Sequence, residues 1–113
     1  MNETLTEQDF RLQADHALEQ TQRSLLPLAD QEGFEVELQN GVLQILFEDP
    51  SPAKFVVSPN APVRQIWVSA NSKSYKLDWD VVENSFVHLE SGDALKTLVE
   101  KAVSKHLGEE VIL

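Results

Sequence analysis

Six short segments in the middle of the chain alternate apolar and polar residues, and no helical pattern interrupts them. The first two segments are joined by Asn40-Gly41, the strongest short signal for a two-residue β-hairpin turn. Pro50 and Pro52 then break the chain before the third segment. Strands that follow one another without a crossover helix predict an antiparallel sheet. The expected strands cover residues 34–39, 43–47, 54–58, 63–69, 74–79 and 84–89.

Helical periodicity flanks this run of strands on both sides. Thr6 and Asp9 resemble a capping box, and the apolar spacing that follows predicts a first helix over roughly residues 7–26. Pro27 lacks an N–H and disfavours helical geometry in the residue before it, so we expect a stop or a kink there. A second amphipathic helix is expected to open after Ser91-Gly92-Asp93 and to end at Gly108.

These elements predict an α+β fold built as a two-layer sandwich. An antiparallel sheet of about six strands would carry the N-terminal and C-terminal helices on one face, because both apolar stripes must be buried. A chain of 113 residues with 42% apolar content suits one domain over residues 1–113. The ends, residues 1–5 and 109–113, are expected to be flexible or loosely packed tails.

The composition excludes several classes of function. Nine scattered Lys and Arg residues and a net charge of −10 provide no basic stripe for nucleic acid or an anionic membrane surface. The absence of cysteine excludes disulfides, zinc–thiolate sites and a thiol nucleophile, and it favours a reducing compartment. The first residues do not resemble a signal peptide, and no segment is apolar enough to span a membrane. We therefore expect a cytoplasmic protein.

Negative charge is concentrated in the first half of the chain. Residues 1–49 hold eleven acidic and two basic side chains, so this half carries nearly all of the net charge. Such a field suits a surface that meets cations or a basic partner. Carboxylates on one face would suit hard cations that prefer oxygen ligands, whereas a merely solvated acidic face is the more common outcome. The acids concerned are Glu7, Asp15, Glu19, Asp30, Glu32, Glu35 and Glu37.

Two further residues stand out as candidates. His16 lies one helical turn from Glu19, which makes it the histidine best placed to assist a cation. Trp67 alternates with Ile66 and Val68 and is therefore expected on the solvent side of the sheet. There it would be a binding hot spot, or it would pack against Tyr75 or a neighbouring strand as a cross-strand aromatic pair. No phosphate-binding glycine loop or nucleophile elbow is present, so an enzyme is the weaker interpretation.

The order of elements and several local motifs resemble the frataxin family in its bacterial form. The resemblance covers roughly residues 5–108 and rests on an opening helix, the hairpin, the meander and a closing helix. Its most specific motifs are Asn40-Gly41-Val42-Leu43, Pro62-Val63-Arg64-Gln65-Ile66-Trp67 and the acidic turn from Leu28-Ala29-Asp30 to Glu37.

The resemblance implies a function in iron–sulfur cluster biogenesis. In frataxins an acidic ridge on the first helix and first strand binds iron weakly and docks on a basic surface of the cysteine desulfurase. The sheet surface around the tryptophan contacts the desulfurase and scaffold assembly. The ridge residues carried over are Glu7, Asp15, Glu19, Asp30 and Glu35, and Glu32 and Glu37 are neighbours of the same charge. His16 is an additional candidate ligand on the same helix. On the sheet the candidates for partner binding are Gln65, Trp67 and Ser69, with Asn60 added although the family has other residues around that position.

The expected ligand is therefore surface-bound ferrous or ferric iron, with other divalent cations as substitutes. The expected partners are a cysteine desulfurase and its scaffold, and the protein is expected to be a monomer that iron could drive into oligomers. Two other functions stay open: a metal-independent acidic interaction module that steers a basic partner, and a ferroxidase acting on the same ridge.

Overall fold

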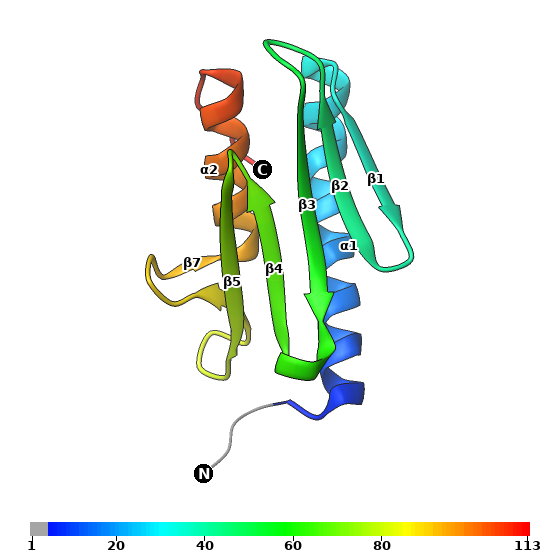
Figure 1. Ribbon diagram of the computed structural model, residues 1–113, viewed down its shortest axis with the longest axis vertical. Coiled ribbons are helices and arrows are strands. Elements are labelled where there is room, and N and C mark those ends of the chain that lie inside the picture. Colours follow the sequence, from blue (N-terminus) through cyan, green and yellow to red (C-terminus); the bar gives the residue numbers. More distant parts are fainter. Residues whose placement is uncertain (1–4) are drawn as a thin grey trace.

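The computed structural model describes residues 5–113, which form two α-helices and seven β-strands in an α+β arrangement (Figure 1). The expectation of a loose N-terminal tail therefore falls mostly outside the described residues. In chain order the elements are α1 (Glu7–Glu32), β1 (Glu35–Gln39), β2 (Val42–Phe47), β3 (Ala53–Asn60), a 3-10 turn η1 (Ala61–Val63), β4 (Gln65–Ala70), β5 (Lys73–Asp80), β6 (Ser85–His88), β7 (Asp93–Ala94) and α2 (Leu95–Leu107).

The seven strands form one antiparallel meander whose spatial order is the order of the chain, β1 to β7. This confirms the predicted fold class and adds a strand to the six expected. The added strand, β7, pairs with β6 through Val87 opposite Ala94 and His88 opposite Asp93. A strand of two residues is too short to show an alternating pattern, so only the pairing reveals it.

Helix α1 begins as expected and ends later than expected. Thr6 is the N-cap, and its side chain accepts a hydrogen bond from the backbone N–H of Asp9 at 3.1 Å. Of the stop or kink predicted at Pro27, the stop is wrong, because the helix continues to Glu32 and is closed by Gly33 in the left-handed conformation. Pro27 lies on the exposed side while Leu25 and Ala29 are buried. Packing on both sides of the proline therefore offsets the missing backbone hydrogen bond.

Both helices cover the same face of the sheet, and the core lies between the two layers (Figure 1). Phe10 of α1 meets Phe86 of β6 edge to face, with ring centroids 5.6 Å apart. Val103 of α2 and Ile45 of β2 are fully buried in the same cluster. The other face of the sheet has no helix over it, so its side chains face solvent. None of the helices within residues 5–113 is long and apolar enough to cross a membrane.

The last residues are more ordered than the sequence suggested. The expected loose tail over residues 109–113 is corrected by Val111, which is 8% exposed and belongs to the core cluster. Its backbone N–H donates to the hydroxyl of Ser104 at 3.0 Å, and the N–H of Leu113 donates to a carboxylate oxygen of Glu100 at 2.9 Å. Five residues are too few to show a period, so the sequence gives no sign of this packing.

Replacing Val111 with alanine should therefore lower the free energy of unfolding by about 2 kcal/mol, because two buried methyl groups are lost and a small cavity remains. Ile112 is the matched control because its side chain is 87% exposed. Both variants are compared with the unsubstituted protein by urea unfolding. Ile112→Ala should change the free energy of unfolding by less than about 0.5 kcal/mol. Equal effects of the two substitutions would show that the terminal segment does not pack as described.

Candidate metal-binding and partner-binding surfaces

Three acids share the exposed flank of α1, and two of them are close enough to act together. Asp15, Glu19 and Asp30 are all exposed, and helical geometry puts them within about 60° of one another around the axis. Asp15 and Glu19 are one turn apart, so their carboxylates are neighbours. Asp30 lies about 16 Å further along the helix from Glu19. Only Asp15 and Glu19 can therefore share one cation on this flank.

The turn between β1 and β2 borders this acid pair. Asn40 and Gly41 both have positive φ angles, as the predicted two-residue hairpin turn requires. A side-chain Cβ placed on Gly41 would lie 4.0 Å from Oδ1 of Asp15, so the turn approaches the carboxylate closely. A hollow of about 330 Å³ lies between α1 and this turn and is lined in part by Arg11, Asp15 and Pro59.

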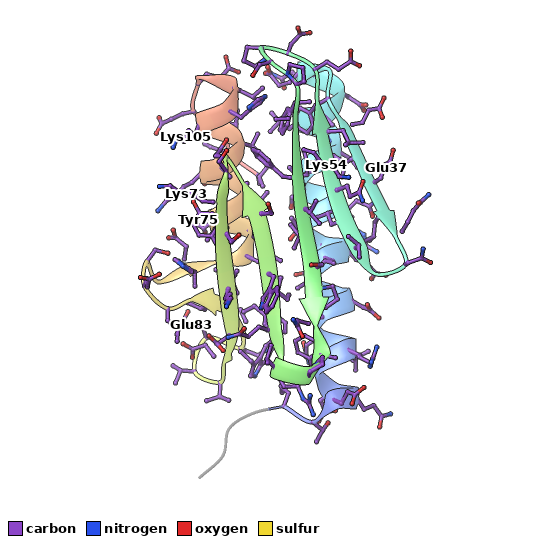
Figure 2. All side chains as sticks on the ribbon, viewed as in Figure 1. Glu37, Lys54, Lys73, Tyr75, Glu83 and Lys105 are labelled. Carbon is purple, nitrogen blue, oxygen red and sulfur yellow. The ribbon has the colours of Figure 1, made fainter. Side chains whose placement is uncertain are left out.

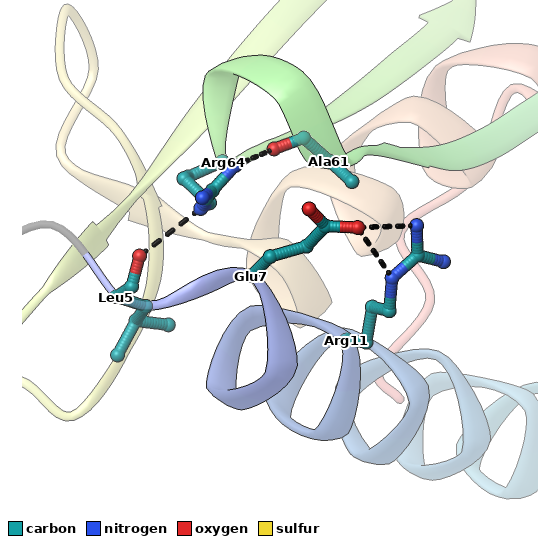
Figure 3. Close-up of polar contacts among 5 residues, drawn as sticks. All are labelled: Leu5, Glu7, Arg11, Ala61 and Arg64. Atoms are coloured by element: carbon teal, nitrogen blue, oxygen red, sulfur yellow. Dashed lines mark hydrogen bonds and ion pairs between the residues drawn. The ribbon is translucent and has the colours of Figure 1, made fainter.

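Glu7 is already engaged by a base. Its Oε2 accepts hydrogen bonds from Arg11 Nη2 at 2.8 Å and Arg11 Nε at 3.2 Å (Figure 3). The hydrogen bond and positive charge of Arg11, with a smaller effect of Arg64, lower the pKa of Glu7. Arg64 itself donates to the backbone oxygens of Leu5 and Ala61. A cation at Glu7 would have to compete with Arg11.

Two candidate residues on α1 face other neighbours. His16 lines a hollow of about 160 Å³ between the two helices, together with Trp79, Phe86 and Lys96. Glu32, at the end of the helix, lies beside Glu109. Partial burial raises the pKa of Glu32, and a hydrogen bond and charge repulsion with Glu109 raise it further. Neither residue adds a ligand to the Asp15 and Glu19 pair.

The two acids of β1 lie on the open face of the sheet. The register aligns Glu37 with Gln44 of β2, and Gln44 in turn with Val56 of β3 and Ser69 of β4. Paired residues of an antiparallel sheet project to the same side, so Glu37 shares a face with Ser69. Glu35 is two residues from Glu37 and shares that face. Figure 2 shows Glu37 near the outer edge of the sheet.

The acids predicted to form one ridge are therefore divided between the α1 flank and the open sheet face. Within residues 5–113, no group of three or more His, Asp or Glu side chains is arranged to hold a metal ion. The spacing along α1 correctly indicated that Asp15 and Glu19 share a face. It carried no information about which side of the sheet the acids of β1 would occupy.

Trp67 projects from the open face, as its strand phase predicts. Ile66 and Val68 are buried, whereas Trp67 is 38% exposed. The indole Nε1 donates to the side-chain oxygen of Gln65 at 2.9 Å, and the amide of Gln65 donates to Asp78 at 3.1 Å. These two hydrogen bonds fix the orientation of the indole ring on the surface.

The cross-strand neighbour of Trp67 is Lys76, whose Nζ lies 5.1 Å from the ring centroid. The expected aromatic pair with Tyr75 is wrong, because Tyr75 is paired with buried Val68, faces the helical layer and packs on His88. The expected packing of Trp67 against a neighbouring strand is made by Lys76 instead of an aromatic residue. The side chains of Lys76 and Asp78 were not singled out from the sequence. Both residues alternate with Tyr75, Leu77 and Trp79 along β5, and this alternation could have indicated that they share the open face with Trp67.

The expected partner-binding residues share this face. Asn60 is paired with Gln65, so both project to the same side as Trp67 and Ser69. A hollow of about 260 Å³ beside the indole is lined mainly by Val56, Ser58, Trp67, Ser69 and Lys76. The open face thus presents an aromatic side chain beside an apolar hollow, with the acids of β1 at its edge. This arrangement is suited to docking a protein.

A family model described as a frataxin-like domain matches residues 3–109. The chain belongs to the frataxin family. An iron–sulfur cluster assembly protein CyaY of Janthinobacterium sp. (strain Marseille) is 32% identical over 111 residues, which cover 96% of both chains. A protein of the same name from Azotobacter vinelandii is 28% identical over 110 residues, covering 96% of this chain and 94% of the relative.

The fold agrees with a solved frataxin. The frataxin of Psychromonas ingrahamii superposes with a TM-score of 0.75 at 20% sequence identity, covering 96% of this chain and 97% of that one. At this identity the likeness concerns the fold alone. The frataxin fold accounts for the two helices on one face of the sheet and the open face opposite them.

The Glu32 and Glu109 pair predicts a dependence of stability on pH. Because the pKa of Glu32 is raised in the folded protein, the contribution of this carboxyl to stability is fully present below its unfolded pKa and is lost as the pH rises through the folded pKa. Replacing Glu109 with Gln removes the repulsion. It should raise the thermal midpoint at about pH 7 and leave it unchanged at about pH 4.

The neighbouring exposed acid Glu110 provides the control. Glu110→Gln should shift the midpoint less than Glu109→Gln at neutral pH. An equal rise in the thermal midpoint from both substitutions would mean that only the net charge matters. It would contradict a specific repulsion between Glu32 and Glu109.

Proposed function

We propose that this protein is an iron-binding regulator or iron donor of iron–sulfur cluster assembly, acting in the bacterial cytoplasm on a cysteine desulfurase and its scaffold. The observation that carries the proposal is the exposed Trp67 on the open face of a frataxin sheet, with Glu35 and Glu37 at the edge of that face. Two relatives that match over 94–96% of each chain are iron–sulfur cluster assembly proteins, which supports the same process.

Iron would bind at the Asp15 and Glu19 pair. Both side chains are exposed, and neither makes an ion pair within residues 5–113. Two carboxylates supply hard oxygen ligands, and water would complete the coordination of a ferrous or ferric ion. A site with so few protein ligands binds weakly and releases its ion readily. Weak binding suits a donor or a sensor more than a storage protein.

The partner would be recognised on two surfaces. The acids on the α1 flank and on β1 steer a basic surface of the desulfurase towards the protein, and this attraction weakens as salt rises. Trp67 then serves as the anchor, because a partly exposed aromatic ring loses water contact when a partner covers it. The hollow beside the ring accepts a side chain of the partner.

A metal-independent interaction module is the second candidate function. It is favoured by the position of Glu35 and Glu37 on the same face as Trp67, where their charges would contact the partner directly. In that case the acids determine affinity for the desulfurase, and cation binding has no part in the function. The rate of oxygen consumption separates both candidates from a ferroxidase, because ferrous iron also oxidises without protein and only a ferroxidase consumes oxygen faster than the protein-free solution.

The metal proposal is tested by reversing the acid pair. The double substitution Asp15→Lys and Glu19→Lys should abolish the iron-dependent shifts of amide signals around residues 15–19 and 41. The free energy of unfolding should change by less than about 1 kcal/mol, because exposed charges contribute little to stability.

The control is Glu83→Lys with Glu110→Lys, which changes the net charge equally at exposed sites on other parts of the surface. Equal loss of iron binding in both double variants would indicate a general charge effect and contradict the assigned pair. Retained desulfurase binding without iron binding would favour the metal-independent module.

The docking proposal is tested with two tryptophans that point to opposite faces. Trp67→Ala should weaken binding to the desulfurase by about 2 kcal/mol or more and lower stability by less than about 1 kcal/mol. Trp79 packs on Phe86 with ring centroids 5.0 Å apart, so Trp79→Ala should lower stability by about 2–3 kcal/mol and leave affinity nearly unchanged. Affinity is measured by calorimetry and stability by urea unfolding. If Trp67→Ala lowered stability and left the affinity for the desulfurase unchanged, the open face would not be the docking surface.

A further inference from the structure

A separate hollow lies on the opposite margin of the molecule from β1. It has a volume of about 170 Å³ and lies between α2, the start of β5 and the turn that joins β6 to β7. Its polar lining includes Lys101, Lys105, His88 and Ser91, and Leu98 contributes to an apolar floor. One water needs only about 10–15 Å³, so there is room for a small organic molecule.

The lining contains two lysines and one acid, Asp93, so it has an excess of one positive charge although the whole chain carries −10. Glu90 lies 3.6 Å from His88, but its side chain is 92% exposed, so solvent screens its charge. Nζ of Lys101 lies 3.0 Å from Oδ2 of Asp93 and donates hydrogen bonds to both carboxylate oxygens. This ion pair neutralises one positive charge and orients the lysine side chain. Lys105 makes no ion pair within residues 5–113. Lys73 lies two residues before Tyr75 on the same side of β5, and Figure 2 shows both on the margin that carries Lys105. A negative ligand is therefore favoured.

Hydrogen-bond donors complement these charges. Nδ1 of His88 lies 2.8 Å from the hydroxyl of Ser91, and that hydroxyl accepts from the backbone N–H of Asp93 at 3.3 Å. When His88 also donates to it, the hydroxyl hydrogen of Ser91 is left to donate to a ligand. The ring of Tyr75 packs edge to face on His88 and forms one wall of the hollow.

The walls of the hollow are held together before any ligand binds. The side-chain amide of Asn71, in the turn between β4 and β5, donates to the backbone oxygen of Ala102 on α2 at 3.2 Å. On the other side, the ion pair of Lys101 with Asp93 joins α2 to β7. Because these contacts already order the walls of the hollow, a ligand would lose less free energy to immobilising side chains when it binds.

We propose that this hollow binds a small organic phosphate. The phosphate group would lie between Lys105 and Lys101 and accept a hydrogen bond from Ser91, because lysine ammonium groups bind phosphate as point charges. The organic part would lie against Tyr75 and Leu98. The site is independent of the iron and docking surfaces described above, since it shares no residue with them.

The experiment titrates the protein with phenyl phosphate, inorganic phosphate and benzoate at matched ionic strength, and follows the amide signals of residues 88–93 and 101–105. The expected result is saturable binding in which phenyl phosphate is tightest. Lys105→Gln should weaken it at least about tenfold, because a charge-assisted hydrogen bond is lost. Ser91→Ala should weaken it as well.

Lys96→Gln is the matched control, because Lys96 lies on the same helix but lines the hollow between the two helices. It should leave the affinity for phenyl phosphate unchanged. Equal weakening by Lys96→Gln and Lys105→Gln, or shifts that do not saturate, would overturn the site. Tighter binding of benzoate, or equal binding of inorganic phosphate, would overturn the organic phosphate as its ligand.

Discussion

The structure depends on one constraint: a seven-stranded antiparallel sheet must bury one face, and residues 5–113 supply two α-helices to cover it. Inward positions such as Leu43, Ile66 and Leu77 are therefore fully buried. The opposite face stays open along the whole meander, and the helices keep their outer sides in water. Each surface considered for function is a part of the molecule that this arrangement leaves uncovered.

The division of the acids into two groups changes how a cation and a partner would be recognised. Asp15 and Glu19 form a compact pair beside the β1–β2 turn, whereas Glu35 and Glu37 belong to the face that carries Trp67. Iron on the helix flank would leave the open face unobstructed. The two recognition events can therefore be separated by substitution, which a single continuous ridge would not allow.

Local pattern predicted much of this arrangement. A strand has a side-chain period of two, so buried Ile66 and Val68 were enough to place Trp67 outside. The prediction of a helix stop at Pro27 failed because tertiary packing of the helix outweighed the unfavourable local effect of proline. The packing of Val111 and the direction of Glu32 depend on neighbours distant in sequence. Which face the acids of β1 would occupy required the pairing register, which no short window of sequence contains.

The position of β1 at the edge of the sheet has a consequence for copies of the protein that meet one another. An outer strand has backbone groups without partners on one side and can act as a template for another chain. Two such strands approaching each other would bring Glu35 and Glu37 of both copies together, and like charges across a strand pair are unfavourable. The charges of Glu35 and Glu37 thus disfavour edge-to-edge pairing of two copies through β1.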